Sequence, residues 1–361
     1  MVPIQKPYVI KRGNSWYYRI TVGKTTEGKR KTKSKGGFRT KREAVNAATE
    51  LLILIKNGHY NEYSQMPFGE FMEQFLTDKK LRIRPSTLEQ YTWAVRKQII
   101  PAIGDVPLGK LKPFTLQEFY NNLAREGKVS SMNLRKIHTL IKAALKKAVR
   151  WELIDRNVAE LLDAPREEKS EIVVWDLDQA KKFISFAESY PYYLAFLLAI
   201  TTGARQGEIL GLRWKDVDLE RGIISIVQTL SHDGKRMNPA PKTKAGRRTL
   251  SLPTEVTQEL KRWKGLPDHL VVQSKADTPI NPRNLNRQFK NIIEKAELPN
   301  IRFHDLRHTH ATLLLLQGVH PKIVAERLGH ANTRMTLDTY SHLLPNMQQE
   351  AAEKFGQIFF T

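Results

Sequence analysis

Two histidines and an arginine lie close together late in the chain. His304, Arg307 and His308 fall within five residues, so on a helix they share one face. A guanidinium binds two phosphate oxygens at once and keeps its charge when desolvated, and an imidazole one turn away can transfer a proton. The cluster therefore predicts acid–base chemistry at a phosphate.

A zinc site is the alternative for the same histidines, because histidines four positions apart can chelate a metal. The sequence at 304–308, HDLRH, lacks the glutamate of the HExxH zinc motif and places an arginine between the candidate ligands. The pattern therefore favours phosphate chemistry over a metal site.

Arg205 lies where a long apolar segment ends, within the sequence TTGARQGE at 201–208. If the next stretch is helical, the carboxylate of Glu208 can reach back and orient Arg205 as catalytic support. Taken alone, this pair is more typical of a surface salt bridge.

Tyr340 follows the sequence Leu328-Gly329-His330 by ten residues. A phenol is a weak nucleophile at its usual pKa of about 10, but it becomes useful beside cations. Attack on a DNA phosphate would conserve the bond energy as a phosphotyrosine, so rejoining would need no ATP. The alternative is a buried tyrosine whose hydroxyl is hydrogen-bonded.

A strong positive charge points to a polyanionic partner. The 361 residues include 59 Lys and Arg against 37 Asp and Glu, a net charge of +22. Residues 1–60 hold 14 basic and 3 acidic side chains, half of this excess. Because each neutralised phosphate releases counterions, such a patch predicts salt-dependent binding to nucleic acid, with a solvated basic surface as the alternative.

Composition also excludes several classes of protein. The absence of cysteine rules out disulfides, thiolate metal sites and cysteine nucleophiles. The first residues lack the apolar core of a secretory signal, and the longest apolar stretch, 192–200, is too short to span a bilayer. We therefore expect a soluble cytoplasmic protein without a membrane partner.

Three segments would position these residues, and the first is residues 1–60. Strand-like runs at 15–22 and about 30–34 precede a helix that Thr40 and Glu43 would cap as a capping box. The pattern predicts a small sheet packed on one helix.

Residues 65–163 have the periodicity of helices throughout. Ser86 with Glu89, and Thr115 with Glu118, form two capping boxes, each preceded by a proline. We expect helices near 67–79, 86–100, 115–125 and 131–151.

The last of these helices carries basic residues, including Lys142 and Lys146, around an apolar stripe. One face can pack while the other contacts phosphates, although an ordinary solvated face would have the same pattern.

A polar linker at 163–171 separates the third segment, residues 172–361. Strands and a hairpin are expected between 216 and 252. Helices are expected near 176–189, 192–203, 254–264, 282–297, 305–317, 321–328 and 333–342. The fold class is therefore multidomain and mostly α-helical, with small β-sheets.

The order of these motifs resembles the tyrosine recombinase family, also called phage integrases. The matching features are Arg205 within TTGARQGE, HDLR at 304–307, LGH at 328–330 and Tyr340. The resemblance covers all three segments. It implies an arm-binding domain with a three-stranded sheet and one helix at 1–60, a helical, SAM-like core-binding domain at 65–163, and an α+β catalytic domain at 172–361.

The resemblance also implies a role for each matched residue. Arg205 and Arg307 would bind the scissile phosphate, and His304 would assist proton transfer at the tyrosine. His330 would hydrogen-bond the phosphate, and Tyr340 would be the nucleophile.

The family also uses a lysine in a β-hairpin as general acid for the departing 5′-oxygen. The segment 241–248, PKTKAGRR, is similar to that hairpin. Lys242 is the expected acid, with Lys244 as the alternative.

By resemblance, the protein would integrate and excise a mobile element or prophage through a 3′-phosphotyrosine and a Holliday junction, without a cofactor or metal. Its partners would be double-stranded core and arm attachment sites, three further copies of the chain in a synaptic tetramer, an excisionase and a host DNA-bending protein. Arg19, Lys31 and Lys33 are candidates for arm-site contacts from their strand-like positions. The apolar tail, with Phe355, Ile358, Phe359 and Phe360, would dock on a neighbouring protomer or pack within its own.

Two other functions are compatible with parts of the pattern. A type IB topoisomerase would use the same tyrosine chemistry without partner exchange, but the charged first segment speaks against it. A non-catalytic regulator could use 320–340 as a helix-turn-helix. That function leaves the order of the arginines, histidines and tyrosine unexplained.

Overall fold

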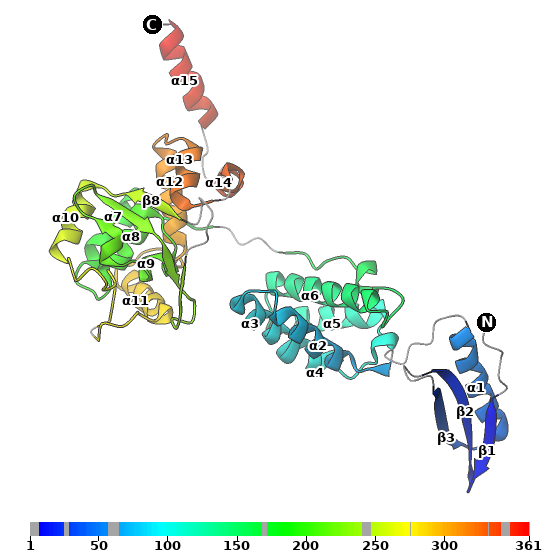
Figure 1. Ribbon diagram of the computed structural model, residues 1–361. Coiled ribbons are helices and arrows are strands. Elements are labelled where there is room, and N and C mark those ends of the chain that lie inside the picture. Colours follow the sequence, from blue (N-terminus) through cyan, green and yellow to red (C-terminus); the bar gives the residue numbers. More distant parts are fainter. Residues whose placement is uncertain are drawn as a thin grey trace. The chain divides into compact units, whose positions relative to one another are not determined.

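The computed structural model describes residues 7–24, 29–56, 65–167, 172–239, 247–274, 276–330, 332–340 and 347–360. The chain forms two compact units, Met1–Lys169 and Ser170–Thr361 (Figure 1). The boundary between the predicted first and second domains stays a prediction. None of the described helices is both long and apolar enough to cross a membrane.

The first unit begins with an antiparallel sheet in the order β1-β2-β3, which packs against one helix (Figure 1). Its elements are β1 (Tyr8–Arg12), β2 (Ser15–Lys24), β3 (Arg30–Phe38) and α1 (Lys41–Lys56). Tyr18 and Ile20 of β2 and Ala48 of α1 form the buried core. Glu43 N–H donates to Thr40 Oγ1 over 3.1 Å and Thr40 N–H donates to the Glu43 carboxylate over 3.4 Å, so the predicted capping box is confirmed.

The rest of the first unit is a helical bundle, as predicted. It contains α2 (Phe68–Lys80), α3 (Pro85–Ala94), a π-helical turn (Val95–Ile99), α4 (Ile100–Ile103), α5 (Pro113–Glu126) and α6 (Ser131–Arg150). Short 3₁₀ turns lie at Leu108–Lys110 and Val158–Leu161. Aromatic and aliphatic side chains of these helices form one core, including Phe68, Phe71, Phe75, Leu116, Ile137 and Ile141.

Two predicted capping boxes in this bundle are wrong. The helices α3 and α5 begin at Pro85 and Pro113, and neither has a side-chain cap. Proline suits the first helical position because its fixed φ is helical and its missing N–H is not needed there. Ser86 and Thr115 therefore lie inside the first turn rather than at the cap.

The second unit surrounds a larger apolar core that includes Trp175, Phe183, Phe196, Phe289 and Phe303. Its helices are α7 (Leu177–Ala187), α8 (Tyr193–Thr202), α9 (Gln206–Leu210), α10 (Thr254–Arg262), α11 (Pro282–Lys295), α12 (Asp305–Leu316), α13 (Pro321–Leu328), α14 (Thr333–Tyr340) and α15 (Met347–Phe360). Seven of them agree with the predicted helices to within a few residues, whereas α15 was not predicted and α9 was considered only as a condition for the contact between Arg205 and Glu208.

Two small antiparallel sheets complete this unit. One has the order β4-β5-β8, with β4 (Val217–Asp218), β5 (Ile223–Ile226) and β8 (Arg248–Ser251). The other pairs β6 (Gln228–Leu230) with β7 (Met237–Pro239). The predicted fold class, mostly α-helical with small sheets, is confirmed.

Candidate active site

Arg205 is positioned by the end of α8. That helix is buried on nearly all sides and ends at Gly203, whose φ of +66° is left-handed. A Cβ at Gly203 would come within 2.6 Å of His310 Cδ2 and 2.7 Å of Leu328 Cδ2, so both the backbone conformation and the packing require glycine. The chain then turns into α9, with Arg205 at the N-cap.

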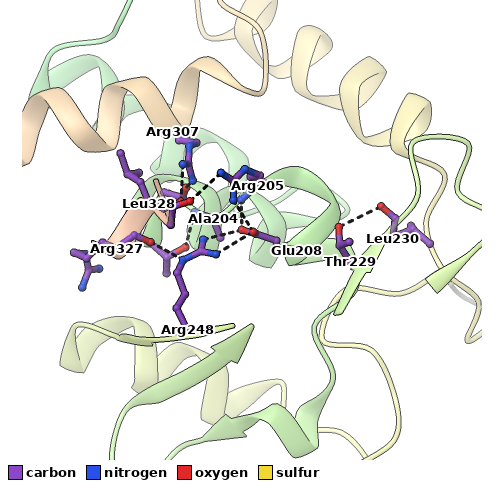
Figure 2. A network of polar contacts seen from close by, with 12 residues as sticks. Ala204, Arg205, Glu208, Thr229, Leu230, Arg248, Arg307, Arg327 and Leu328 are labelled. Atoms are coloured by element: carbon purple, nitrogen blue, oxygen red, sulfur yellow. Dashed lines mark hydrogen bonds and ion pairs between the residues drawn. The ribbon is translucent and has the colours of Figure 1, made fainter. Parts of the chain in front are cut away.

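Glu208 lies in the first turn of α9 and is nearly inaccessible, with 8 % of its side chain exposed. Its carboxylate accepts hydrogen bonds from Arg205 Nη1 at 3.0 Å and from the Arg205 backbone N–H at 2.8 Å (Figure 2). The predicted contact between the two residues is therefore present. Its burial distinguishes it from a surface salt bridge.

Arg248 on β8 contacts the same carboxylate. Its Nη1 and Nη2 lie 3.0 and 2.8 Å from the two oxygens of Glu208 (Figure 2). Burial alone would raise the pKa of Glu208, but the hydrogen bonds and charge of Arg248, with those of Arg205, outweigh it and lower the pKa to about 2. The carboxylate is therefore ionised at neutral pH and joins two arginines from different elements.

Arg307 comes from α12 and is only 3 % exposed. Its Nη1 donates to the Gly203 carbonyl over 2.7 Å and its Nη2 to the Leu328 carbonyl over 2.6 Å. Burial, and then the nearby charge of Arg205, lower the pKa of Arg307 to about 9. This value is above neutral pH, so the guanidinium stays charged there.

Three consecutive backbone carbonyls at the end of α13 each accept a hydrogen bond from a different arginine. The carbonyl of residue 327 accepts from Arg248 Nε at 2.8 Å, that of residue 328 from Arg307, and that of residue 329 from Arg205 Nη2 at 3.3 Å. Figure 2 shows how these side chains, which come from β8, α12 and α9, approach this end of the helix. The predicted phosphate-binding arginines are thus brought together.

His330 follows Gly329, whose φ of +66° ends α13. Its Nδ1 is 2.8 Å from the Thr336 hydroxyl on α14. Burial and then the charge of Arg307 lower the pKa of His330 to about 4, so the ring is neutral at pH 7.

His304 occupies the N-cap position of α12 without a side-chain capping hydrogen bond, and its ring meets that of His308 edge-on at 5.2 Å between centroids. Burial and the charge of Arg307 lower the pKa of His304. The side chain also lines a cavity of about 430 Å³ with Gln206 and Arg302.

Tyr340 ends α14 and has no exposed surface. Its ring packs among Ala311, Leu315, Val324 and Leu328. Its hydroxyl lies 2.8 Å from His308 Nδ1. Burial raises the pKa of Tyr340 to about 12, although the charge of Arg307 acts in the opposite direction.

The expected general acid, Lys242, and its alternative, Lys244, lie outside the described residues. Among the described residues, no group of three or more histidine, aspartate or glutamate side chains is arranged to hold a metal ion.

The candidate DNA-binding residues lie in the first unit. Lys142 and Lys146 are exposed on α6, whose other face is buried. Arg19 pairs with Ser34, and Lys33 pairs with Ile20, so the register places Arg19 and Lys33 on opposite faces of the sheet. Lys31 pairs with Gly23.

The sequence motifs assign no role to Arg248, and they do not identify His308 as a partner of Tyr340. The alternation of β8, which buries Leu250, provides a signal for Arg248, since residues two apart on a strand share a face. The contact between His308 and Tyr340 joins α12 to α14 and has no local signal.

Comparisons with known proteins match all three segments. The chain matches the phage integrase family over residues 174–347, the N-terminal SAM-like domain of phage integrases over 67–124, and an arm DNA-binding domain over 8–54. A tyrosine recombinase XerC-like protein of Caldanaerobacter subterraneus subsp. tengcongensis is 29 % identical, covering 98 % of this chain and 99 % of the relative. The ICEBs1 integrase of Bacillus subtilis is 26 % identical, covering 88 % and 90 %.

Two solved structures share the fold. The Tn1549 transposon integrase in complex with transposon right-end DNA has a TM-score of 0.69 at 21 % identity, covering 82 % of this chain and all of that one. A lambda integrase tetramer bound to a Holliday junction has a TM-score of 0.62 at 21 % identity, covering 92 % and 95 %.

Proposed function

Because this chain belongs to the phage integrase family, we propose that it is the site-specific integrase of a mobile element or prophage, and that it cleaves and rejoins DNA through Tyr340. One observation carries the proposal. The N-cap of α9, helix α12 and the end of α13 bring together the half-exposed Arg205, the buried Arg307 and the neutral His330, and the buried tyrosine of α14 lies within reach of the charge of Arg307.

The two arginines are suited to a phosphodiester. Arg205 remains 43 % exposed while Glu208 and a backbone carbonyl hold part of its guanidinium, so it presents charge to solvent in a fixed orientation. Fixed donors stabilise the charge that develops on the phosphate oxygens without reorganising during the reaction. In this proposal His330 adds a further hydrogen bond to the same phosphate.

The proposed reaction has two steps. The Tyr340 oxygen forms a bond to phosphorus as the bond to the 5′-oxygen breaks, which leaves a 3′-phosphotyrosine and a 5′-hydroxyl. The 5′-hydroxyl of a partner strand then attacks the phosphotyrosine and releases the tyrosine. Lys242 is proposed to protonate the departing 5′-oxygen, with Lys244 as the alternative.

The partners follow from the same proposal. Relatives of this fold are bound to transposon-end DNA and, as a tetramer, to a Holliday junction. We infer that this chain binds core sites through its second and third segments and arm sites through its first, in the cytoplasm, and that it assembles as a tetramer on DNA. An excisionase and a host DNA-bending protein are proposed to set the direction of recombination.

The test is formation of a covalent adduct. Purified protein is mixed with DNA from the ends of its own element in EDTA, and SDS-resistant protein–DNA adducts are measured for the wild type and Tyr340→Phe. The matched control is Tyr120→Phe, because Tyr120 is a buried tyrosine of the helical bundle whose hydroxyl has no partner among the described residues. Adducts are expected with the wild type and the control but not with Tyr340→Phe.

Two outcomes would contradict the proposal. Tight binding without adducts on nicked trapping substrates would favour a non-catalytic regulator. If the protein formed adducts and relaxed plasmids but never joined two attachment sites, a topoisomerase would be favoured.

A further inference from the structure

The hydroxyl of the proposed nucleophile contacts a histidine outside the catalytic set expected from sequence. His308 follows Arg307 directly on α12, and its Nδ1 lies 2.8 Å from the Tyr340 hydroxyl, with 5.5 Å between the ring centroids. His304 lies one turn before His308, and its ring contacts that of His308 edge-on. Its side chain lines a cavity together with Gln206 and Arg302. His308 is thus the histidine in direct contact with the reacting atom.

We propose that His308 is a catalytic residue that takes the proton of Tyr340 during cleavage and returns it during rejoining. The inference rests on the proposed function. In cleavage, the O–H bond of Tyr340 breaks, its proton moves to His308 Nδ1, and the oxygen forms its bond to phosphorus while the bond to the 5′-oxygen breaks. The departing 5′-oxygen takes a proton from the general acid.

Rejoining reverses each transfer. The incoming 5′-hydroxyl gives its proton back to the general acid as its oxygen bonds to phosphorus, and Tyr340 departs as a phenolate that recovers its proton from His308. One proton is therefore exchanged at the tyrosine oxygen and one at the 5′-oxygen. After rejoining, His308 and the general acid are back in their starting protonation states. No further reactant is required.

The surroundings keep His308 in the form that can accept a proton. Burial, then His304, Arg307 and Arg302, lower its pKa to about 4, although Asp305 acts in the opposite direction. The ring is therefore neutral at pH 7 and has one nitrogen with a free lone pair. Acceptance at Nδ1 requires the tautomer with hydrogen on Nε2.

The same surroundings keep the nucleophile unreactive when no phosphate is bound. With a pKa of about 12 for Tyr340 and about 4 for His308, the proton stays on the phenol. A bound phosphate places negative charge beside Arg307 and the histidines, which raises the pKa of His308 because an opposite charge favours the imidazolium. The site therefore couples ionisation of the tyrosine to the arrival of DNA.

The first test measures single-turnover adduct formation on a nicked attachment-site DNA, with either an oxygen or a sulfur atom at the bridging 5′ position. A thiolate leaves without protonation, so the sulfur substrate bypasses the general acid but still needs the tyrosine to lose its proton. We expect His308→Ala to slow both substrates by about 10²–10⁴-fold, with DNA affinity unchanged. His308→Asn keeps an acceptor near Nδ1 but cannot take a proton, so it should restore the rate only in part.

The matched control is His320→Asn. His320 is exposed at the N-cap of α13, where its Nδ1 accepts from the Lys322 backbone N–H, and asparagine can cap a helix in the same way. Adduct formation should be unchanged in this variant. A His308→Ala rate within threefold of wild type, or full recovery of that variant on the sulfur substrate, would overturn the proposal.

A second measurement needs no change at His308. The chain has 10 histidines. In Tyr340→Phe, only His308 Nδ1, which is hydrogen-bonded to the Tyr340 hydroxyl, should change its ¹⁵N NMR shift strongly. An unchanged His308 Nδ1 shift would contradict the contact, even if His308→Ala failed to fold. Absence of adducts in the wild type would count against the proposed function, whereas wild-type adducts with an unaffected His308→Ala would count against this inference alone.

Discussion

Replacing Glu208 with glutamine should destabilise the catalytic unit in a pH-dependent way. The substitution keeps the shape of the side chain but removes the charge that Arg205 and Arg248 share. Lowering the pKa of Glu208 from 4.5 to about 2 corresponds to about 3 kcal/mol of stability at neutral pH. Removing one partner of a buried ion pair costs about 3–5 kcal/mol in general, which is similar to the value from the pKa shift of Glu208.

The sign of the pH dependence follows from the direction of the shift. A carboxyl whose pKa is lower in the folded state stabilises the protein above its unfolded pKa, and this contribution is lost as the pH falls through the folded pKa. The difference in the free energy of unfolding between wild type and Glu208→Gln should therefore be about 3 kcal/mol at pH 7, about 1 kcal/mol at pH 3, and near zero well below pH 2.

Urea unfolding of the full chain, followed by hydrogen exchange in peptides of residues 172–330, measures this difference for the catalytic unit alone. Glu220→Gln is the matched control, because the Glu220 side chain is 91 % exposed and should change stability by no more than about 0.5 kcal/mol. A Glu208→Gln difference below about 0.5 kcal/mol at pH 7, or one that stays constant down to pH 2, would contradict a stabilising role for the Glu208 charge.

Further predictions concern packing, protonation and DNA binding. Gly203→Ala should lower the free energy of unfolding by about 2–4 kcal/mol, because it adds backbone strain and a clash with the His310 ring; unchanged urea unfolding would contradict this. The pKa values of His308, His310 and His330 are lowered to about 4, so the unfolded state binds more protons below pH 6.5. The melting temperature of the catalytic unit should therefore fall from pH 6.5 to 4, and a flat profile would count against these shifts. Deleting residues 1–60 should leave core-site cleavage unchanged, but should weaken arm-site binding and make that binding less dependent on salt. If the deletion variant and the full chain bound arm sites with the same affinity in a titration, this would argue against the arm domain.

Much of the helical structure could be predicted because its signals are local. The apolar spacing and terminal residues predicted 321–328 and 131–151, and α13 and α6 have those limits to within one residue. The strand Tyr8–Arg12 carries a weaker signal, since a short edge strand has little alternation to detect. The starts at Pro85 and Pro113 were misplaced because a serine or threonine after a proline resembles a cap.

The site was predictable only in part. Arg205, Arg307 and Tyr340 stand in sequence motifs, so their types and order could be recognised. The contact of Arg248 with Glu208 spans 40 residues, and that of His308 with Tyr340 spans 32. Such pairs form only when separate elements pack together, and neither helical nor strand periodicity encodes them.

The arginines at the end of α13 also complete that helix. An α-helix leaves its last carbonyls without partners and carries a partial negative charge there. The guanidiniums from α9, α12 and β8 supply the missing donors, and the helix macrodipole offsets part of the repulsion among the three cations. Folding of α13 and assembly of the cationic site are therefore one event, and the site is preorganised before any phosphate arrives. An insertion or deletion of a single residue in Arg327-Leu328-Gly329 would misalign every arginine at once.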